Sequence, residues 1–380
     1  MHNGMTIQEM LTEVVRHNDT KQDYIASTKE HLAMVTMPDA GYDKNIALVL
    51  ARPESNELER FGITDNFHQQ LATRLKIPSK YYYRLLDDHR DLLLDNVNTL
   101  FKREPEIRMV RTLDGKARAF LSRQFRRVDN EQILEATLPV IKNEFDTEIL
   151  STFVDENRLK FKCLFPGEEH RVDLGISGGK PDNVQAGFEM GNSETGRGSF
   201  YIRGFLYRGR CLNGCVFGME ETASFKQIHV GSKLGIDEGM LLSNETMRLE
   251  DELIVSAAKD VLTNLASPKF TQQVGDKLRA LKARQPVKDA HAAVEAITTE
   301  LRMTETESRS VLESFIRDQD YSQWGMVNAV TEQANPQTTR GEVRDIDYNR
   351  ASAIEEMGNK IINLPANRWT SIANMVKVAA

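Results

Sequence analysis

Arginine side chains concentrate in two stretches of the chain, and their planar guanidinium groups suit contacts with phosphate. Residues 102–127 hold nine basic side chains against three acidic ones, and residues 197–210 hold four arginines and no acid. Aromatic residues alternate with the arginines of the second stretch, and such rings can stack on unpaired bases. This pattern predicts a surface for single-stranded nucleic acid. The candidate contact residues are Arg108, Arg111, Arg118, Arg123, Arg126, Arg127, Arg197, Arg203, Tyr207, Arg208 and Arg210.

The same arginines have a second interpretation, which is pairing with the chain's many carboxylates across strands or subunits. Alternation along a strand also limits how many of them share one face. Arg108 and Arg118 need not lie on the face that carries Arg111 and Arg123. Only some of these arginines can line one groove, and the sequence leaves both interpretations open.

The glycine-rich run at residues 191–198 (GNSETGRG) superficially resembles a phosphate-binding loop. An ATPase loop requires a lysine and a Ser or Thr at the start of a helix. Here Arg197 and Gly198 stand in those places, and a strand pattern follows, so the ATPase interpretation fails. A tight turn whose N–H groups accept a backbone phosphate remains open. The chain also lacks the nucleophile-elbow, metalloprotease and dinucleotide motifs, so we predict no catalytic residues and no cofactor.

Metal binding is the weakest of the chemical options. Cys211 and Cys215 have a spacing found in zinc sites, but the only other cysteine, Cys163, sits within a strand pattern. Free cysteines often behave as small buried hydrophobic residues, so the prediction contains no metal ligand and leaves the three thiols undecided. Acid pairs such as Asp87-Asp88 and Glu220-Glu221 allow a metal-dependent nuclease only as a third hypothesis, because no further ligand stands at a recognisable spacing.

Composition limits the classes of protein that remain. The 380 residues carry a formal net charge of −7, which excludes a histone-like protein that coats nucleic acid by bulk charge. Residues 1–100 and 241–380 carry this acidity, whereas residues 101–240 hold 21 basic and 21 acidic side chains. Three cysteines indicate a reducing compartment, and the longest apolar run, residues 46–51, is far too short to span a bilayer. The N-terminus lacks a signal-peptide pattern, so we expect a cytoplasmic protein without a membrane partner.

The periodicity predicts three regions that would position these residues. Residues 1–100 are mixed and contain two short helices joined at Lys76-Ile77, which fit a helix-turn-helix or ordinary helix packing. Residues 101–241 alternate as strands, with a hairpin at Asp114-Gly115, and form an α+β core. Residues 242–380 have helical spacing. The expected fold class is α+β, a central and mostly antiparallel sheet with flanking helices, followed by an α-helical C-terminal region.

Several longer segments resemble the phage- and plasmid-like family known as domain of unknown function 932. They include residues 111–134, residues 184–218 and residues 320–335, in this order, and the resemblance covers most of residues 60–335. It implies a mobile-element context and supplies no established catalytic residues. Asn192-Ser193-Glu194 and Asn213-Gly214 in these segments fit local turns, since Asn-Gly is typical of a type I′ turn, and they also fit contacts to a ligand.

The first functional hypothesis is a mobile-element protein that binds single-stranded nucleic acid, with DNA favoured, and pairs complementary strands during recombination or replication. By analogy with ring-forming phage annealing proteins, we expect a homo-oligomer. The second hypothesis is a structural or interaction protein whose helical C-terminal region docks a host or phage partner. The sequence does not decide whether the protein is an enzyme, but it favours a protein without catalytic activity.

Overall fold

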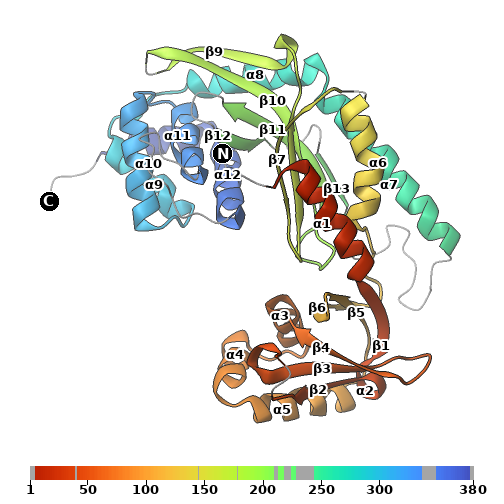
Figure 1. Ribbon diagram of the computed structural model, residues 1–380. Helices are drawn as coiled ribbons and strands as arrows, with labels where there is room; N and C mark the ends of the chain where they lie inside the picture. The colour runs from red at the N-terminus through yellow and green to blue at the C-terminus, as the bar shows by residue number, and fades with distance from the viewer. Residues whose placement is uncertain are drawn as a thin grey trace.

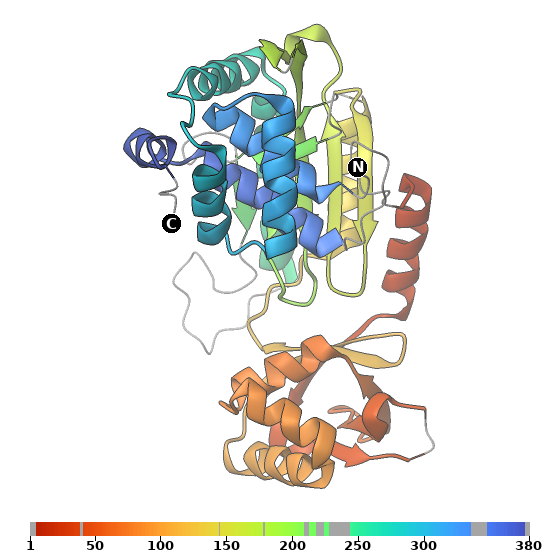
Figure 2. The ribbon, with the colours of Figure 1, turned by 90° about the vertical axis from the view of Figure 1, so that its left-hand side faces the viewer.

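The computed structural model places the chain in two lobes, each built around one β-sheet (Figure 1). Figure 2 shows the same two lobes after a quarter turn, with the small lobe beneath the large one. The structure describes residues 5–38, 41–143, 145–177, 179–208, 213–217, 224–227, 244–335 and 348–376. Two segments of the chain, around residues 21 and 122, lead from one lobe into the other.

The small lobe contains a six-stranded sheet in the order β1-β5-β6-β4-β3-β2. Neighbouring strands are antiparallel except β4 and β6, which are parallel. The strands are β1 (Gln22–Ser27), β2 (Leu32–Thr36), β3 (Ile46–Ala51), β4 (Leu58–Ile63), β5 (Ile107–Leu113) and β6 (Lys116–Ser122).

Helices pack their apolar sides against one face of this sheet and form the core of the small lobe with it. They are α2 (Thr28–His31), α3 (Asp65–Arg74), α4 (Ser79–Asp88) and α5 (Arg90–Arg103), with a short 3₁₀ helix η1 (Asp43–Asn45). Thr64 caps α3, because its side chain accepts the Phe67 N–H at 3.3 Å. Phe67 and Tyr82 are fully buried in the core of the lobe, so α3 and α4 show ordinary helix packing against their own sheet.

The β5–β6 hairpin forms at the predicted turn. Asp114 and Gly115 both have positive φ angles, 50° and 72°, as a type I′ turn requires. The hairpin pairs with β1 on one side and β4 on the other, so it completes the small-lobe sheet. The predicted boundary between residues 100 and 101 therefore falls inside the small lobe, whose sheet continues to Ser122.

The large lobe contains a second, fully antiparallel sheet in the order β12-β11-β10-β8-β7. Strand β9 pairs with the first half of β10, and β13 pairs with β11. The strands are β7 (Glu148–Val154), β8 (Leu159–Leu164), β9 (Arg171–Ser177), β10 (Lys180–Asn192), β11 (Phe200–Arg208), β12 (Asn213–Phe217) and β13 (Ser224–Gln227). Asn213 and Gly214 pair with Arg208 and Tyr207, so they lie within β12 and the predicted turn at these two residues is wrong.

Helices flank both sides of this sheet, and most of them belong to the C-terminal region. Figure 1 shows α6 and α7 on one side and the group α9–α12 on the other. The helices are α1 (Ile7–Thr20), α6 (Asn130–Asn143), α7 (Asn244–Leu265), α8 (Pro268–Lys282), α9 (Ala290–Glu300), α10 (Glu305–Asp318), α11 (Gln323–Thr331), α12 (Tyr348–Ile362) and α13 (Ala366–Ala373), with 3₁₀ helices η2 (Glu168–His170) and η3 (Glu332–Ala334). The α+β class with a helical C-terminal region is confirmed.

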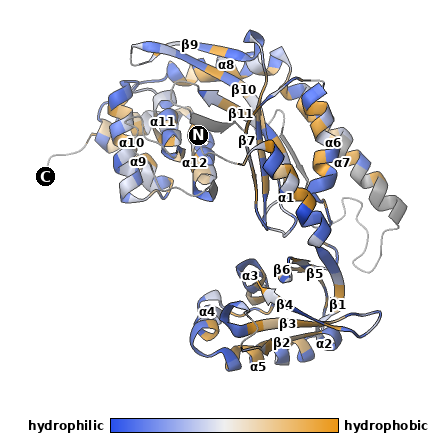
Figure 3. Cartoon of the chain, viewed as in Figure 1, coloured by the Kyte–Doolittle hydropathy of each residue, from blue (hydrophilic) through white to orange (hydrophobic). Residues whose placement is uncertain are grey.

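Hydrophobic residues gather where helices meet the sheets, and hydrophilic residues follow the outer surfaces (Figure 3). The large lobe has one continuous core that includes the fully buried Trp324 and Trp369. The small lobe has its own core, around Phe67, Tyr82 and Phe101. Among the helices in the described part of the chain, none has the length and apolar composition needed to cross a bilayer.

Candidate nucleic-acid interface

Four of the candidate arginines lie inside the protein. Arg108, Arg111, Arg118 and Arg208 are each no more than 5% exposed, and Arg111 has no exposed surface. A guanidinium that solvent cannot reach cannot contact the phosphates of an incoming strand. In this structure these four side chains therefore do not line an open groove, contrary to the prediction from the sequence.

Arg111 connects the two lobes through three hydrogen bonds in different directions. Its Nε donates to Asp23 Oδ1 at 2.7 Å, within the small-lobe sheet. Its Nη1 donates to the carbonyl oxygen of Glu194 at 2.9 Å, and its Nη2 donates to Asp129 Oδ1 at 2.8 Å. The fork geometry of arginine allows all three contacts at once, so the side chain joins β5 to the segment that follows β10 and to the residue that precedes α6.

Glu194 is the acidic centre of the same junction. Its Oε2 accepts a hydrogen bond from Arg118 Nη2 at 2.7 Å, and Arg118 also donates to the carbonyl oxygen of Glu156 at 3.0 Å. Its Oε1 accepts the backbone N–H of Asn130 at 2.8 Å. This N–H belongs to the first residue of α6, where the helix has unpaired donors and a partial positive charge. Glu194 therefore caps a helix that lies far from it in the sequence.

The charges of this junction balance. Its members are here called the interlobe network: Lys21, Asp23, Arg111, Arg118, Asp129 and Glu194. Three are cations and three are carboxylates, so the charges of these six side chains sum to zero. Burial opposes ionisation of Asp129, but Arg111 and Lys21 outweigh it and lower the pKa of Asp129 to about 2. The sequence pattern did not indicate Lys21 or Asp23, because their partners lie at large sequence separations.

Neutral side chains extend the contact between the lobes. Gln70 Nε2 on α3 donates to the carbonyl oxygen of Thr195 at 2.7 Å, and Asn66 Oδ1 accepts from Arg197 Nε at 2.7 Å. Within the large lobe, Asn192 Nδ2 donates to Asn130 Oδ1 at 2.8 Å and so joins β10 to α6. Residues 192–197 thus hold α6 against β10 and link the two lobes, which favours the structural interpretation of the Asn192-Ser193-Glu194 motif.

The remaining arginines of the first stretch reach the surface in one loop between β6 and α6. We call residues 123–127 the arginine loop. Arg123 and Arg127 are exposed, Arg126 is half-buried, and Phe125 anchors the loop in a small apolar cluster. Arg127 Nη1 lies 3.5 Å from Asp23 Oδ2 at the edge of the interlobe network. The side chains of Arg123 and Arg127 are therefore accessible to a ligand.

The glycine-rich turn lies next to the arginine loop. We call residues 195–199 the glycine loop. A Cβ atom placed on Gly196 would lie 2.9 Å from Leu121 Cδ2 and 3.6 Å from Phe125 Cε2, so the two loops are in contact. Gly196 and Gly198 are exposed, and the side chain of Arg197 is 30% exposed. The loops that carry Arg123, Arg126, Arg127 and Arg197 are thus neighbours in the structure.

Two arginines of the second stretch, Arg203 and Arg208, are neutralised by carboxylates. Arg203 on β11 donates through Nη2 to Glu189 Oε1 at 2.8 Å and to Glu356 Oε1 at 3.0 Å. Arg208 donates through Nε to Asp182 Oδ1 at 2.5 Å. Tyr207 is half-buried, and burial raises its pKa; Arg210 lies outside the described residues. Arg203 and Arg208 therefore pair with carboxylates, as the second interpretation of the sequence expects.

A buried ionic group beneath α12 was not predicted. Lys162 on β8 lies 3.6 Å from Glu189 Oε2, and its Nζ donates to Glu355 Oε2 on α12 at 2.5 Å. Burial lowers the pKa of Lys160 and raises the pKa of Glu355. A possible signal was the alternation Lys-Phe-Lys at residues 160–162, because two lysines on one strand face call for buried partners.

The cysteines offer no thiolate in the described structure. Cys163 is fully buried on β8, and burial raises the pKa of its thiol to about 12, so it stays protonated. Cys211 lies outside the described residues, as does the side chain of Cys215. Among the described residues, no three His, Cys, Asp or Glu side chains are arranged to hold a metal ion. Of the acid pairs, Asp87 binds Lys44 at 2.9 Å, and Glu220-Glu221 lies outside the described residues.

Comparison with known proteins finds no protein similar to this chain. No protein-family model, no curated protein and no solved structure matches the chain. The resemblance to domain of unknown function 932 therefore stays a prediction.

Proposed function

We propose that this protein binds single-stranded nucleic acid at the junction of the lobes, where the arginine loop meets the glycine loop, and that it does so without covalent chemistry. The observation that carries the proposal is the exposure of Arg123 and Arg127 beside Gly196 and Gly198. Exposed guanidinium groups can each bind phosphate oxygens, and glycine lets a phosphodiester backbone approach the main chain closely.

The size of this surface favours single strands over a duplex. The two loops supply four arginines, Arg123, Arg126, Arg127 and Arg197. A single strand bends easily and can turn consecutive phosphates toward so small a surface, whereas duplex DNA is stiff over about 150 base pairs. Contacts to phosphate also leave the base edges free to pair with a second strand.

The sequence resemblance supports the biological part of the proposal. A phage- or plasmid-like protein that holds single strands fits recombination or replication of a mobile element, in the cytoplasm of its host. Self-association would extend the short binding surface along a strand, and for this reason the proposal includes a homo-oligomer. DNA is favoured over RNA by the same context.

Fluorescence anisotropy with labelled oligonucleotides of about 30 nucleotides tests the proposal. We expect binding to single-stranded DNA at low salt that exceeds binding to the matching duplex. With four arginines engaged, the logarithm of the binding constant should fall with the logarithm of salt concentration with a slope of about −3. Absence of detectable binding at low salt would overturn the proposal.

The interaction hypothesis keeps one specific observation in its favour. Leu249 and Leu253 lie one turn apart on α7 and are 52% and 68% exposed. Exposed leucines on one helix face are typical of a surface that docks another protein. Replacing both by serine should lower the recovery of a partner protein bound to the full chain, whereas equal recovery would count against this role.

A further inference from the structure

Strand β1 has an open outer edge. In the small-lobe sheet β1 pairs with β5 alone among the described strands. The Thr28 N–H donates to the Glu106 carbonyl at 2.9 Å. Hydrogen-bonded and non-bonded residues alternate along an antiparallel pair, so every second residue of β1, counted back from Thr28, bonds to β5. The N–H and C=O groups of Asp23 and Ile25 consequently point away from β5, and no described residue bonds to them.

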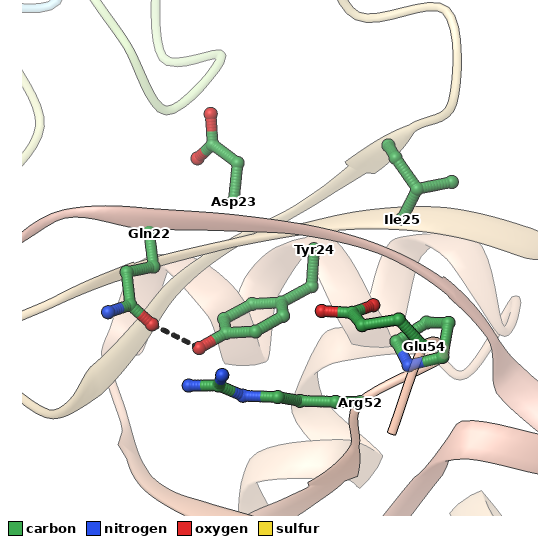
Figure 4. A pocket seen from close by; sticks show the side chains of 7 residues that line it. Gln22, Asp23, Tyr24, Ile25, Arg52 and Glu54 are labelled. Carbon is green, nitrogen blue, oxygen red and sulfur yellow. Dashed lines mark hydrogen bonds between the residues drawn. The ribbon is translucent and has the colours of Figure 1, made fainter. Parts of the chain in front are cut away.

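A hollow of about 450 Å³ lies along this edge (Figure 4). One wall is residues 22–25 of β1, and the other is residues 52–54 of the loop between β3 and β4. Figure 4 shows Asp23 and Ile25 on one side of the strand and Tyr24 on the other, as alternation requires. The loop limits the space beside the edge, so the hollow suits one extended chain better than a second sheet.

The opposite edge of the same sheet is closed. On β2, the Met34 N–H donates to Asn98 Oδ1 at 2.9 Å, and Asn98 Nδ2 donates to the Met34 carbonyl at 2.8 Å. The Asn98 amide on α5 thus takes the place of a neighbouring strand. Exposed edges attract further strands, and proteins usually block them. Here one edge is blocked by a side chain, and the other is left open beside a hollow.

Side chains around the open edge define what would fit there. Ile25 and Ile107 are 43% and 44% exposed, and the pairing of Ser27 with Ile107 puts both on one face of the sheet. The other face meets the loop, where Arg52 stands against three acids and leaves a net negative charge. These acids are Glu54, Glu57 and Glu59.

We propose that the open edge of β1 docks an extended, basic segment of a partner protein, which adds a strand to the small-lobe sheet. The main chain of this segment pairs with Asp23 and Ile25. One of its apolar side chains packs beside Ile25, and a Lys or Arg on its other face lies toward Glu54. Main-chain pairing gives affinity in this mode, and the alternate side chains give specificity. The proposal is independent of the nucleic-acid surface.

The probe is a synthetic eight-residue peptide that alternates isoleucine and lysine, added to the full chain. Amide hydrogen exchange measured by NMR should show at least ten-fold slower exchange at Asp23 and Ile25 in the saturated complex. The Met34 amide, which Asn98 already binds, is the internal control and should not change. Peptides with proline at the central positions, or with glutamate in place of lysine, should bind at least ten-fold more weakly.

Two protein variants complete the test. Glu54→Lys should weaken binding of the lysine peptide at least five-fold, whereas Glu305→Lys, at an exposed position on α10, should leave it within two-fold. The proposal is overturned if the peptide does not bind, if it binds without protecting the Asp23 and Ile25 amides, or if the glutamate peptide binds equally well.

Discussion

The carboxylate of Glu194 lies 2.8 Å from the backbone nitrogen of Asn130, although 64 residues separate the two in sequence. Through this contact the segment that follows β10 caps the start of α6. The other oxygen of the same carboxylate binds Arg118 of the small lobe at 2.7 Å. One side chain therefore joins three parts of the fold and links the two lobes.

We expect Glu194→Ala to lower the free energy of unfolding by about 3–5 kcal/mol, because Arg118 would remain buried without a carboxylate partner. Urea denaturation followed by circular dichroism measures this change. Loss of the link between the lobes should also separate their unfolding into two transitions.

Glu300→Ala is the matched control for this variant. Glu300 binds Arg368 at 2.8 Å, but both side chains are nearly half exposed, and such surface pairs contribute about 1 kcal/mol or less. Equal losses of stability in the two variants would contradict the assigned role of Glu194.

Because β8 and β10 approach closely at Gly187, we expect a larger side chain at this position to destabilise the fold. A Cβ atom at this position would lie 2.0 Å from the Cys163 carbonyl oxygen, a main-chain atom that cannot move alone. We expect Gly187→Ala to destabilise the fold by about 3 kcal/mol, measured by thermal and urea unfolding. At Gly198 the nearest atom would be 3.8 Å away, so Gly198→Ala should change stability by less than about 0.5 kcal/mol. The reverse order of the two effects would refute this account of the packing.

Acid should weaken the fold through His68. Burial lowers the pKa of His68 to about 4 against the opposing effect of Asp65 and Asp43, and its Nδ1 lies 2.8 Å from Tyr82 Oη. The unfolded chain, with a pKa of about 6.5, takes up the proton first, so the free energy of unfolding falls as pH drops from 6.5 to 4. The full loss is about 3 kcal/mol at 1.36 kcal/mol for each pKa unit.

Urea denaturation at several pH values between 7 and 4.5 checks this expectation. His68→Gln removes the titrating group, so its unfolding free energy should depend less on pH over this range. An unchanged slope in the variant would assign the acid sensitivity to other groups.

Local sequence patterns predicted most of the elements. The turn at Asp114-Gly115 and the helical region after residue 242 depend on neighbouring residues, and the structure has both. The position of the β5–β6 hairpin was not predictable in this way. Its partners, β1 and β4, are set by pairing across many residues, which a pattern within one segment does not contain.

The candidate site was predicted only in part for the same reason. The sequence located the arginines but could not distinguish Arg111, which is fully buried, from Arg123, which is exposed. The difference comes from partners such as Asp23, which lies 88 residues from Arg111. The exposed subset emerged only when the fold brought the arginine loop and the glycine loop together.

The central claim is that exposed arginines at the lobe junction bind single-stranded nucleic acid, and charge reversal there tests it most directly. The measurement is the salt dependence of single-stranded DNA binding by Arg123→Glu with Arg127→Glu. Its control is Arg279→Glu with Arg309→Glu, which changes the net charge equally at two exposed arginines on α8 and α10. We expect the loop variant to bind at least about ten-fold more weakly at low salt, with a salt slope about 1.4 smaller, and the control to bind as the natural chain does. Equal binding by the two variants would contradict the claim.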